Sequence, residues 1–221
     1  MNKISLYILL ILIFLGFSKS FSPNLKNINF IKDEKMFSKF IKDGPLSLIL
    51  IESYEHGTFI KSYFQKYRVV HGFKPLNNQF IIFRTSKKFW EKGKMNIGMS
   101  LYRTEKANTP GNSVPMPPGF LFVGDLAYGN WQTKNNSKVW TFQRSYAHFP
   151  KLFKWGSFIP NKKFFLKAVD HKKKGLPFYG EKNQFKKTHS SQNVLSENET
   201  SIHKILKYLK SYWLFPQKRE K

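Results

Sequence analysis

An aromatic stretch at residues 117–149 constrains the fold more than any other part of the chain. After two prolines, the apolar run 120–123 is rich in residues that favour strands; turn residues end it at 124–125, and residues 128–131 resume it. A second run at 139–142 places Trp140 and Phe142 on one face, because side chains alternate along a strand. The spacing predicts that the two runs pair as a hairpin with an aromatic core. The alternative is a stacking platform for sugars or bases, but buried aromatic side chains more often stabilise small domains.

The same region resembles a known set of proteins. The motifs are Gly119-Phe120, Val123-Gly124-Asp125, Tyr128-Gly129, Trp131, Val139-Trp140-Thr141-Phe142, Tyr146 and Gly175-Leu176-Pro177-Phe178-Tyr179-Gly180. With them, residues 115–180 resemble a family of exported, lipoprotein-like bacterial proteins that has no assigned activity. The resemblance implies an envelope setting and a shared fold, and it transfers no catalytic residue. Many members look like lipoproteins, whereas this chain has no cysteine to lipidate.

The first 20 residues have the pattern of a Sec-type signal peptide. Lys3 supplies the positive charge, residues 4–17 form an almost unbroken apolar run, and small residues precede the expected cleavage point after Ser20. Because a membrane-spanning helix needs ~20 apolar residues, this run predicts a cleaved signal rather than a permanent anchor. We therefore expect an exported protein, periplasmic or extracellular, with peripheral attachment to a membrane as a further option.

The chain is strongly basic and has no cysteine, with 38 Lys and Arg against 13 Asp and Glu. Loss of Lys3 and Lys19 with the signal would leave a net charge of +23. Without disulfides the fold depends on a hydrophobic core, to which the 23 phenylalanines contribute. Such a charge attracts polyanions, and export argues against nucleic acid as the natural partner. We expect an anionic lipid or envelope polymer, although a solvated lysine face alone would also account for much of the charge.

The remaining pattern predicts an α+β domain at 21–180, with a small antiparallel sheet, an aromatic-rich core and flanking helices. The expected elements are a helical face at 30–41, strands at 45–51, 79–84 and 96–103, a helix running into a strand at 59–70, a short basic helix or turn around 89–90, and helices at 144–153 and 162–174. Asn161 is expected to cap the last of these helices, with Phe164, Phe165, Leu166 and Val169 facing inward. Residues 104–118 contain four prolines and predict an exposed loop or a hinge.

The C-terminal region predicts a linker at 181–198 followed by a basic amphipathic helix at 199–215. Residues 196–199 have the spacing of a capping box. Lys204, Lys207 and Lys210 alternate with an apolar stripe at helical spacing. Packing on the domain is the ordinary interpretation of such a stripe, and binding to an anionic membrane is the alternative.

The chemistry that the sequence offers is sparse. It lacks the Gly-x-Ser-x-Gly, His-Glu-x-x-His and phosphate-loop motifs, and its six histidines are scattered, so we expect no metal and no cofactor. Asp125 and His148 are the weak catalytic candidates. Asp125 follows a glycine where turn capping is the simpler explanation, and His148 lies among aromatic residues as a packed or surface histidine would.

These observations favour a binding or structural protein of the envelope over an enzyme. Its basic surface would contact anionic envelope material through the lysines Lys172, Lys173, Lys174, Lys204, Lys207 and Lys210. One alternative is an envelope hydrolase acting on glycan or peptide, whose paired carboxylates the sequence does not identify. Another is a membrane-active secreted factor working through the C-terminal helix.

Overall fold

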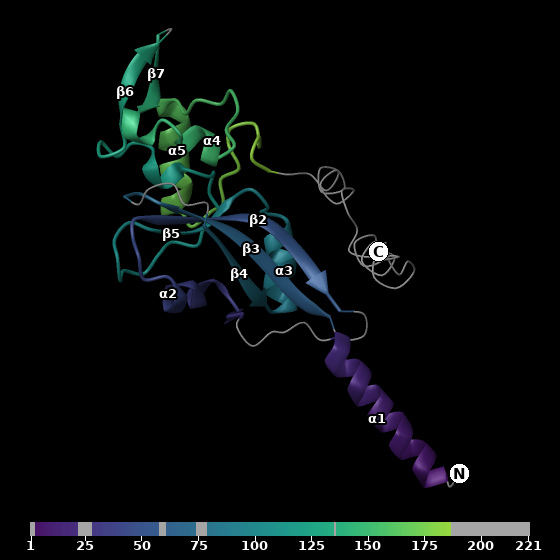
Figure 1. Ribbon diagram of the computed structural model, residues 1–221. Helices are drawn as coiled ribbons and strands as arrows, with labels where there is room; N and C mark the ends of the chain where they lie inside the picture. The colour runs from purple at the N-terminus through teal and green to yellow at the C-terminus, as the bar shows by residue number, and fades with distance from the viewer. Residues whose placement is uncertain (1–2, 22–27, 58–60, 74–78, 135, 187–221) are drawn as a thin grey trace, which may run out of the picture. The chain divides into compact units, whose positions relative to one another are not determined.

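The computed structural model describes residues 3–21, 28–57, 61–73, 79–134 and 136–186 (Figure 1). The expected C-terminal helix and most of the expected linker lie outside these residues. Near the N-terminus, α1 (Lys3–Phe21) is a single helix whose side chains at 3–15 are exposed. In the described part of the chain, no helix is both long and apolar enough to cross a membrane.

Five strands form one mixed sheet in the order β1-β4-β3-β2-β5. The strands are β1 (Phe30–Ile31), β2 (Leu46–His56), β3 (Ser62–His71), β4 (Gln79–Thr85) and β5 (Ser100–Thr104). Only β1 runs parallel to its neighbour, β4, and the other pairs in this sheet are antiparallel. The α+β class is therefore confirmed, with a mixed sheet where an antiparallel one was expected.

The central strand β2 shows how the sheet separates two cores. Leu46, Leu48 and Leu50 belong to one cluster of buried side chains, whereas Ile49 belongs to another. This alternation follows from the two-residue period of a strand. It explains why the expected strand at 45–51 is a continuous apolar run, since both faces of the sheet are covered there.

The expectation of a helix within 59–70 is wrong for the residues that are described. Residues 62–71 are a strand throughout and pair with β2 on one side and β4 on the other. Tyr67 points into the first cluster, while Phe64 stacks on Tyr54 with ring centroids 5.4 Å apart. Aromatic residues at this spacing can form one face of a helix or fill both faces of a strand. Here the segment pairs with a strand on each side, so it forms a strand rather than a helix.

The first cluster lies between the sheet and two short helices, α2 (Phe37–Phe40) and α3 (Lys87–Lys94). Phe37 is fully buried and contacts the rings of Tyr67, Phe83 and Phe89 at 5.4–6.0 Å. The short basic helix or turn expected around 89–90 is a helix, α3. The expected helical face at 30–41 is only partly present, because its first residues form β1.

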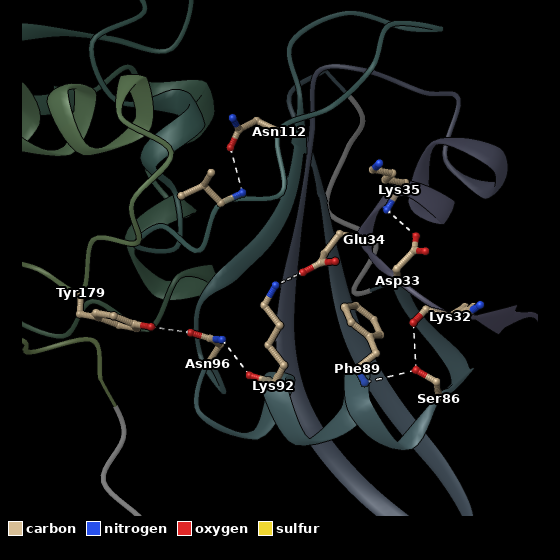
Figure 2. A network of polar contacts seen from close by, with 11 residues as sticks. Lys32, Asp33, Glu34, Lys35, Ser86, Phe89, Lys92, Asn96, Asn112 and Tyr179 are labelled. Carbon is tan, nitrogen blue, oxygen red and sulfur yellow. Dashed lines mark hydrogen bonds and ion pairs between the residues drawn. The ribbon is translucent and has the colours of Figure 1, made fainter.

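A network of polar contacts connects the helices that cover the first cluster (Figure 2). Lys92 on α3 forms an ion pair with Glu34, which lies in the short 3-10 helix η2 (Glu34–Met36). Asn96 donates to the carbonyl of Lys92 at 3.0 Å and accepts from the Tyr179 hydroxyl at 2.9 Å. The segment after α5 is thereby tied back to the sheet layer.

The second cluster covers the other face of the sheet. Its contributing elements are the 3-10 helices η3 (Phe120–Phe122) and η4 (Arg144–Tyr146), the hairpin β6 (Gly129–Lys134) and β7 (Ser137–Phe142), α4 (Phe149–Leu152) and α5 (Lys162–Lys173). Phe122 is fully buried and lies 4.9–5.9 Å from the rings of Tyr128, Phe149 and Phe153. Figure 1 shows the hairpin beside α5, and Trp140 N donates to Pro160 O at 2.8 Å there.

The expected hairpin exists, and its resumed part at 128–131 is confirmed as β6, but the part expected at 120–123 is not a strand. Residues 120–122 form one turn of 3-10 helix, and the strand that pairs with β7 is 129–134. A single 3-10 turn lets Phe122 reach the second cluster while Phe120 reaches a third one beneath α5. Gly129 is the first residue of that strand, and a side chain does not fit there, because a Cβ would lie 2.4 Å from the carbonyl oxygen of Thr141.

Helix α5 follows the expectation closely. Asn161 Oδ1 accepts a hydrogen bond from Phe164 N at 2.8 Å, so it caps the helix as predicted. Phe164 is buried, whereas Leu166 is 56 % exposed and does not face inward; Ala168 is buried instead. The described members of all three clusters come from residues 31–185, so none is a residue of α1.

Candidate functional site

A cleft of about 930 Å³ opens between the loop after β5, the turn at 120–128 and α5. Its apolar walls are formed by Phe73, Phe120, Leu121, Val123, Tyr128, Phe165 and Val169. Its charged residues are Arg103, Glu105, Lys106, Asp125, Lys172 and Lys173. The volume lies within the usual range of small-molecule sites, roughly 300–1,000 Å³. The cleft therefore combines a mostly positive lining with an aromatic wall.

Arg103 is the most unusual residue of the cleft, because its charge is buried. The side chain is 3 % exposed, and its guanidinium donates to Ser100 O at 2.6 Å, Asn112 Oδ1 at 2.7 Å and Val114 O at 2.5 Å. Asn112 Oδ1 also accepts from Val114 N at 3.1 Å (Figure 2). These acceptors are neutral, and burial lowers the pKa of Arg103 to about 9. Among the described residues, the guanidinium has no carboxylate partner.

Glu105 and Lys172 form an ion pair at the cleft, with Oε1 and Nζ 2.8 Å apart. The hydrogen bond and the charge of Lys172 lower the pKa of Glu105, and Lys106 adds to the effect. Glu105 is therefore ionised at neutral pH and has no proton to donate. The pair connects the loop after β5 to the last turn of α5, because Lys172 belongs to that helix.

The two catalytic candidates do not share the cleft. Asp125 lies at it, exposed, and its Oδ1 accepts a hydrogen bond from Ala127 N at 3.0 Å, as a turn-capping aspartate does. His148 precedes α4, contacts the ring of Phe149 edge-on at 5.0 Å, and is not among the residues that line the cleft. Burial lowers the pKa of His148. The geometry thus supplies no Asp125–His148 pair for catalysis.

Tyr128 forms part of the wall next to Asp125. Its ring is buried and stacks on Phe73, with centroids 5.9 Å apart. Burial, followed by the charge of Asp125, raises the pKa of the Tyr128 hydroxyl. This hydroxyl therefore remains protonated at neutral pH.

The predicted lysines separate into three groups. Lys172 and Lys173 line the cleft. Lys174 instead pairs with Asp170 one turn earlier on α5, at 2.8 Å, where both side chains are exposed. Lys204, Lys207 and Lys210 lie outside the described residues.

Sequence reasoning missed Arg103 and Glu105. Arg103 is the single charged residue of β5, Ser100–Thr104, but the burial of all five residues is known only from the structure. A cation inside a buried strand is costly unless it is hydrogen-bonded or holds a ligand. For Glu105 no sequence signal was available, since its partner lies 67 residues away.

A second basic region lies on the sheet itself. Lys66 Nζ lies 4.9 Å from the centre of the Phe80 ring, and the Arg68 guanidinium lies 5.5 Å from the same ring. Arg84 lies over Phe30 at 5.2 Å. The aromatic rings are partly exposed, so these contacts stabilise cations on an open surface. Within the described residues, no three His, Asp or Glu side chains gather as metal ligands would.

No protein-family model matches the chain, and no curated protein or solved structure matches it. The resemblance of residues 115–180 to exported bacterial proteins therefore stays a prediction, as do the signal peptide and the envelope setting. The charge and geometry of the cleft carry the argument for function.

Proposed function

We propose that the protein is an exported binding protein that contacts anionic envelope material, lipid or polymer, at the cleft beside α5. The observation that carries this proposal is the charge balance of the cleft. Four cations, Arg103, Lys106, Lys172 and Lys173, line it against two carboxylates. One of the carboxylates is bonded to Lys172, and the other caps a turn.

The charge of the whole chain supports the same conclusion. The net charge of +25 creates a field that draws anionic partners toward any part of the surface. Long-range attraction of this kind raises the rate of encounter but selects no partner. A cleft with its own positive excess supplies the position at which an attracted anion is held.

Hydrolysis is the second candidate, because Glu105 and Asp125 line one cleft. Glycoside hydrolysis with a general acid needs a carboxyl group whose pKa is raised, so that it carries a proton at neutral pH. The pKa of Glu105 is lowered by Lys172, and Asp125 already accepts a backbone hydrogen bond. Binding without catalysis accounts better for these two residues.

The test is sedimentation with liposomes of defined anionic phospholipid content across a salt series. The protein is used as the full chain and as the chain beginning at Phe21, so that binding by residues 1–20 is measured separately. The described core takes no side chain from α1, so the shorter form retains its folding determinants. We expect binding that weakens steeply as salt rises, because exposed charges are screened over about 8–10 Å.

Matched variants locate the contact. Lys106→Gln with Lys173→Gln removes two cleft cations, while Lys151→Gln with Lys154→Gln removes the same charge from residues that do not line the cleft. The cleft variant should lose most of its binding, and the control should stay near wild type. Equal losses would show that net charge, not the cleft, holds the liposome. Absence of binding at low salt would overturn the proposal, and binding should survive Asp125→Ala.

A further inference from the structure

Arg103 presents a buried positive charge at the wall of the cleft. A guanidinium has five N–H donors, and three hydrogen bonds to neutral oxygen atoms are formed here. Transferring a cation into a protein interior is costly, and neutral acceptors offset only part of that cost. An anion in the cleft would supply the opposite charge that the described residues do not.

The walls around this charge are apolar and firmly placed. Phe165 on α5 packs against the turn at Gly124, where a Cβ would lie 2.5 Å from the ring and where φ is +87°. Phe120 lies against Phe165 with ring centroids 6.0 Å apart. These contacts hold an aromatic surface beside the charged residues, so the cleft suits a molecule that is only partly polar.

The outer part of the cleft is apolar as well. Phe73 lines it, is 69 % exposed, and is held in place by stacking on Tyr128. The cations Lys106 and Lys173 line the same cleft. Their charges would attract the negatively charged head group of a ligand.

From this arrangement we infer that the cleft binds one amphipathic anion, with its carboxylate or phosphate head at Arg103 and its apolar body along Phe120, Phe165 and Val169. Arginine binds both head groups well, because its planar donors match their oxygen atoms. The inference rests on the proposed function and deepens it by naming the chemical class of the ligand. The same chemistry is offered by a free amphiphile and by a single lipid drawn from a bilayer.

The competing explanation is that Arg103 only fastens the loop at 112–114 to β5 through its three hydrogen bonds. Replacing Arg103 therefore tests folding and binding together. A variant that fills the cleft and leaves Arg103 untouched separates the two roles. Val169→Trp does this, because Val169 lines the cleft from α5. Leu166→Trp is its control, on the same helix, 56 % exposed and not part of the lining.

The experiment is calorimetric titration of the chain beginning at Phe21 with dodecyl phosphate below its critical micelle concentration. Inorganic phosphate tests the head alone, and dodecyl maltoside tests the same apolar body with a neutral head. We expect one molecule of dodecyl phosphate bound per chain, and binding of the other two probes weaker by at least about tenfold. Val169→Trp should weaken dodecyl phosphate binding by about tenfold or more, while Leu166→Trp binds as wild type.

Two results would overturn the inference: equal binding of the neutral maltoside, or undiminished binding by Val169→Trp. Arg103→Lys, which keeps the charge, should retain more binding than Arg103→Met, and thermal unfolding of both variants checks that the fold persists. Liposome sedimentation of the same samples separates the two proposals. Retained liposome binding without dodecyl phosphate binding overturns this inference and leaves the proposed function standing, whereas loss of both overturns both.

Discussion

Glu105 Oε1 lies 2.8 Å from Lys172 Nζ, and this ion pair joins the loop after β5 to α5 at the cleft. The two side chains differ in exposure, with Glu105 at 69 % and Lys172 at 33 %. The Glu105 carboxylate is therefore the more solvated partner. It neutralises the charge of Lys172, which would otherwise attract an anionic ligand. The pair sets how much positive charge the cleft offers.

Removing the carboxylate should strengthen anion binding. Glu105→Gln releases Lys172, and because partly exposed pairs are worth about 0.2–1 kcal/mol, the affinity for anionic liposomes should rise by a factor of about 1.4 to 5 at low salt. The control is Glu181→Gln, which releases Lys167 from a 3.0 Å pair away from the cleft. Equal gains in both variants would mean that ligand binding responds to net charge alone.

Two tryptophans of the second cluster should respond differently to loss of the indole N–H. Trp155 Nε1 donates to Pro118 O at 2.9 Å in a buried position. Trp140 Nε1 is buried without a hydrogen-bond partner among the described residues. Since leaving a buried carbonyl unsatisfied costs about 1–3 kcal/mol, Trp155→Phe should lower the free energy of unfolding more than Trp140→Phe does.

Urea unfolding of both tryptophan variants makes the comparison, because each loses a similar volume from the same cluster. The difference between them isolates the hydrogen bond to Pro118. Equal destabilisation, or a larger loss for Trp140→Phe, would show that ring packing outweighs that bond.

The ion pair between Glu34 and Lys92 should make stability depend on acid pH. Burial tends to raise the pKa of Glu34, but the hydrogen bond and charge of Lys92, with a backbone hydrogen bond, lower it below its ordinary value of 4.5. A carboxyl whose pKa is lower in the folded state contributes stability above about pH 4.5. That contribution is lost as pH falls through the lowered pKa.

Thermal unfolding between pH 6 and about pH 2.5, from above to below the ordinary carboxyl pKa, measures this contribution. Glu34→Gln should be less stable than wild type at pH 6, and the gap should close at the acid end. Glu91→Gln is the control, because its pair with Lys87 is 3.9 Å long and exposed on both sides. A gap for Glu34→Gln that persists unchanged at pH 2.5 would contradict the assignment.

The sequence predicts which helices and strands exist better than it predicts where they begin and end. The strands at 45–51 and 79–84 were recognisable as short apolar runs rich in strand formers, and the helix at 162–174 by its helical period, its cap at Asn161 and its glycine stop. The stretch at 120–123 was predicted to be a strand but forms one 3-10 turn, from which its apolar residues pack into two different clusters. The helix expected within 59–70 failed because aromatic residues on both faces of β3 imitate a helical stripe.

The candidate site was less visible than the fold. Lys172 and Lys173 could be singled out as members of a lysine run, and both line the cleft. Their association with Arg103 and Glu105 depends on contacts across 67 or more residues, which no local pattern encodes. Only the burial of all five residues of β5 reveals that Arg103 is out of the ordinary.

The loop that carries Asn112 has a second effect, on the edge of the sheet. Backbone bridges from Arg103 to Asn112 and from Ser100 to Met116 cover β5 along its outer side. At the opposite edge, β1 is only two residues long and pairs with β4 in parallel. The edge at β5 is therefore a poor template for an incoming strand, because its outer backbone groups are already bonded. Repulsion between positive charges acts in the same direction, so backbone pairing and net charge both oppose strand-to-strand association through β5.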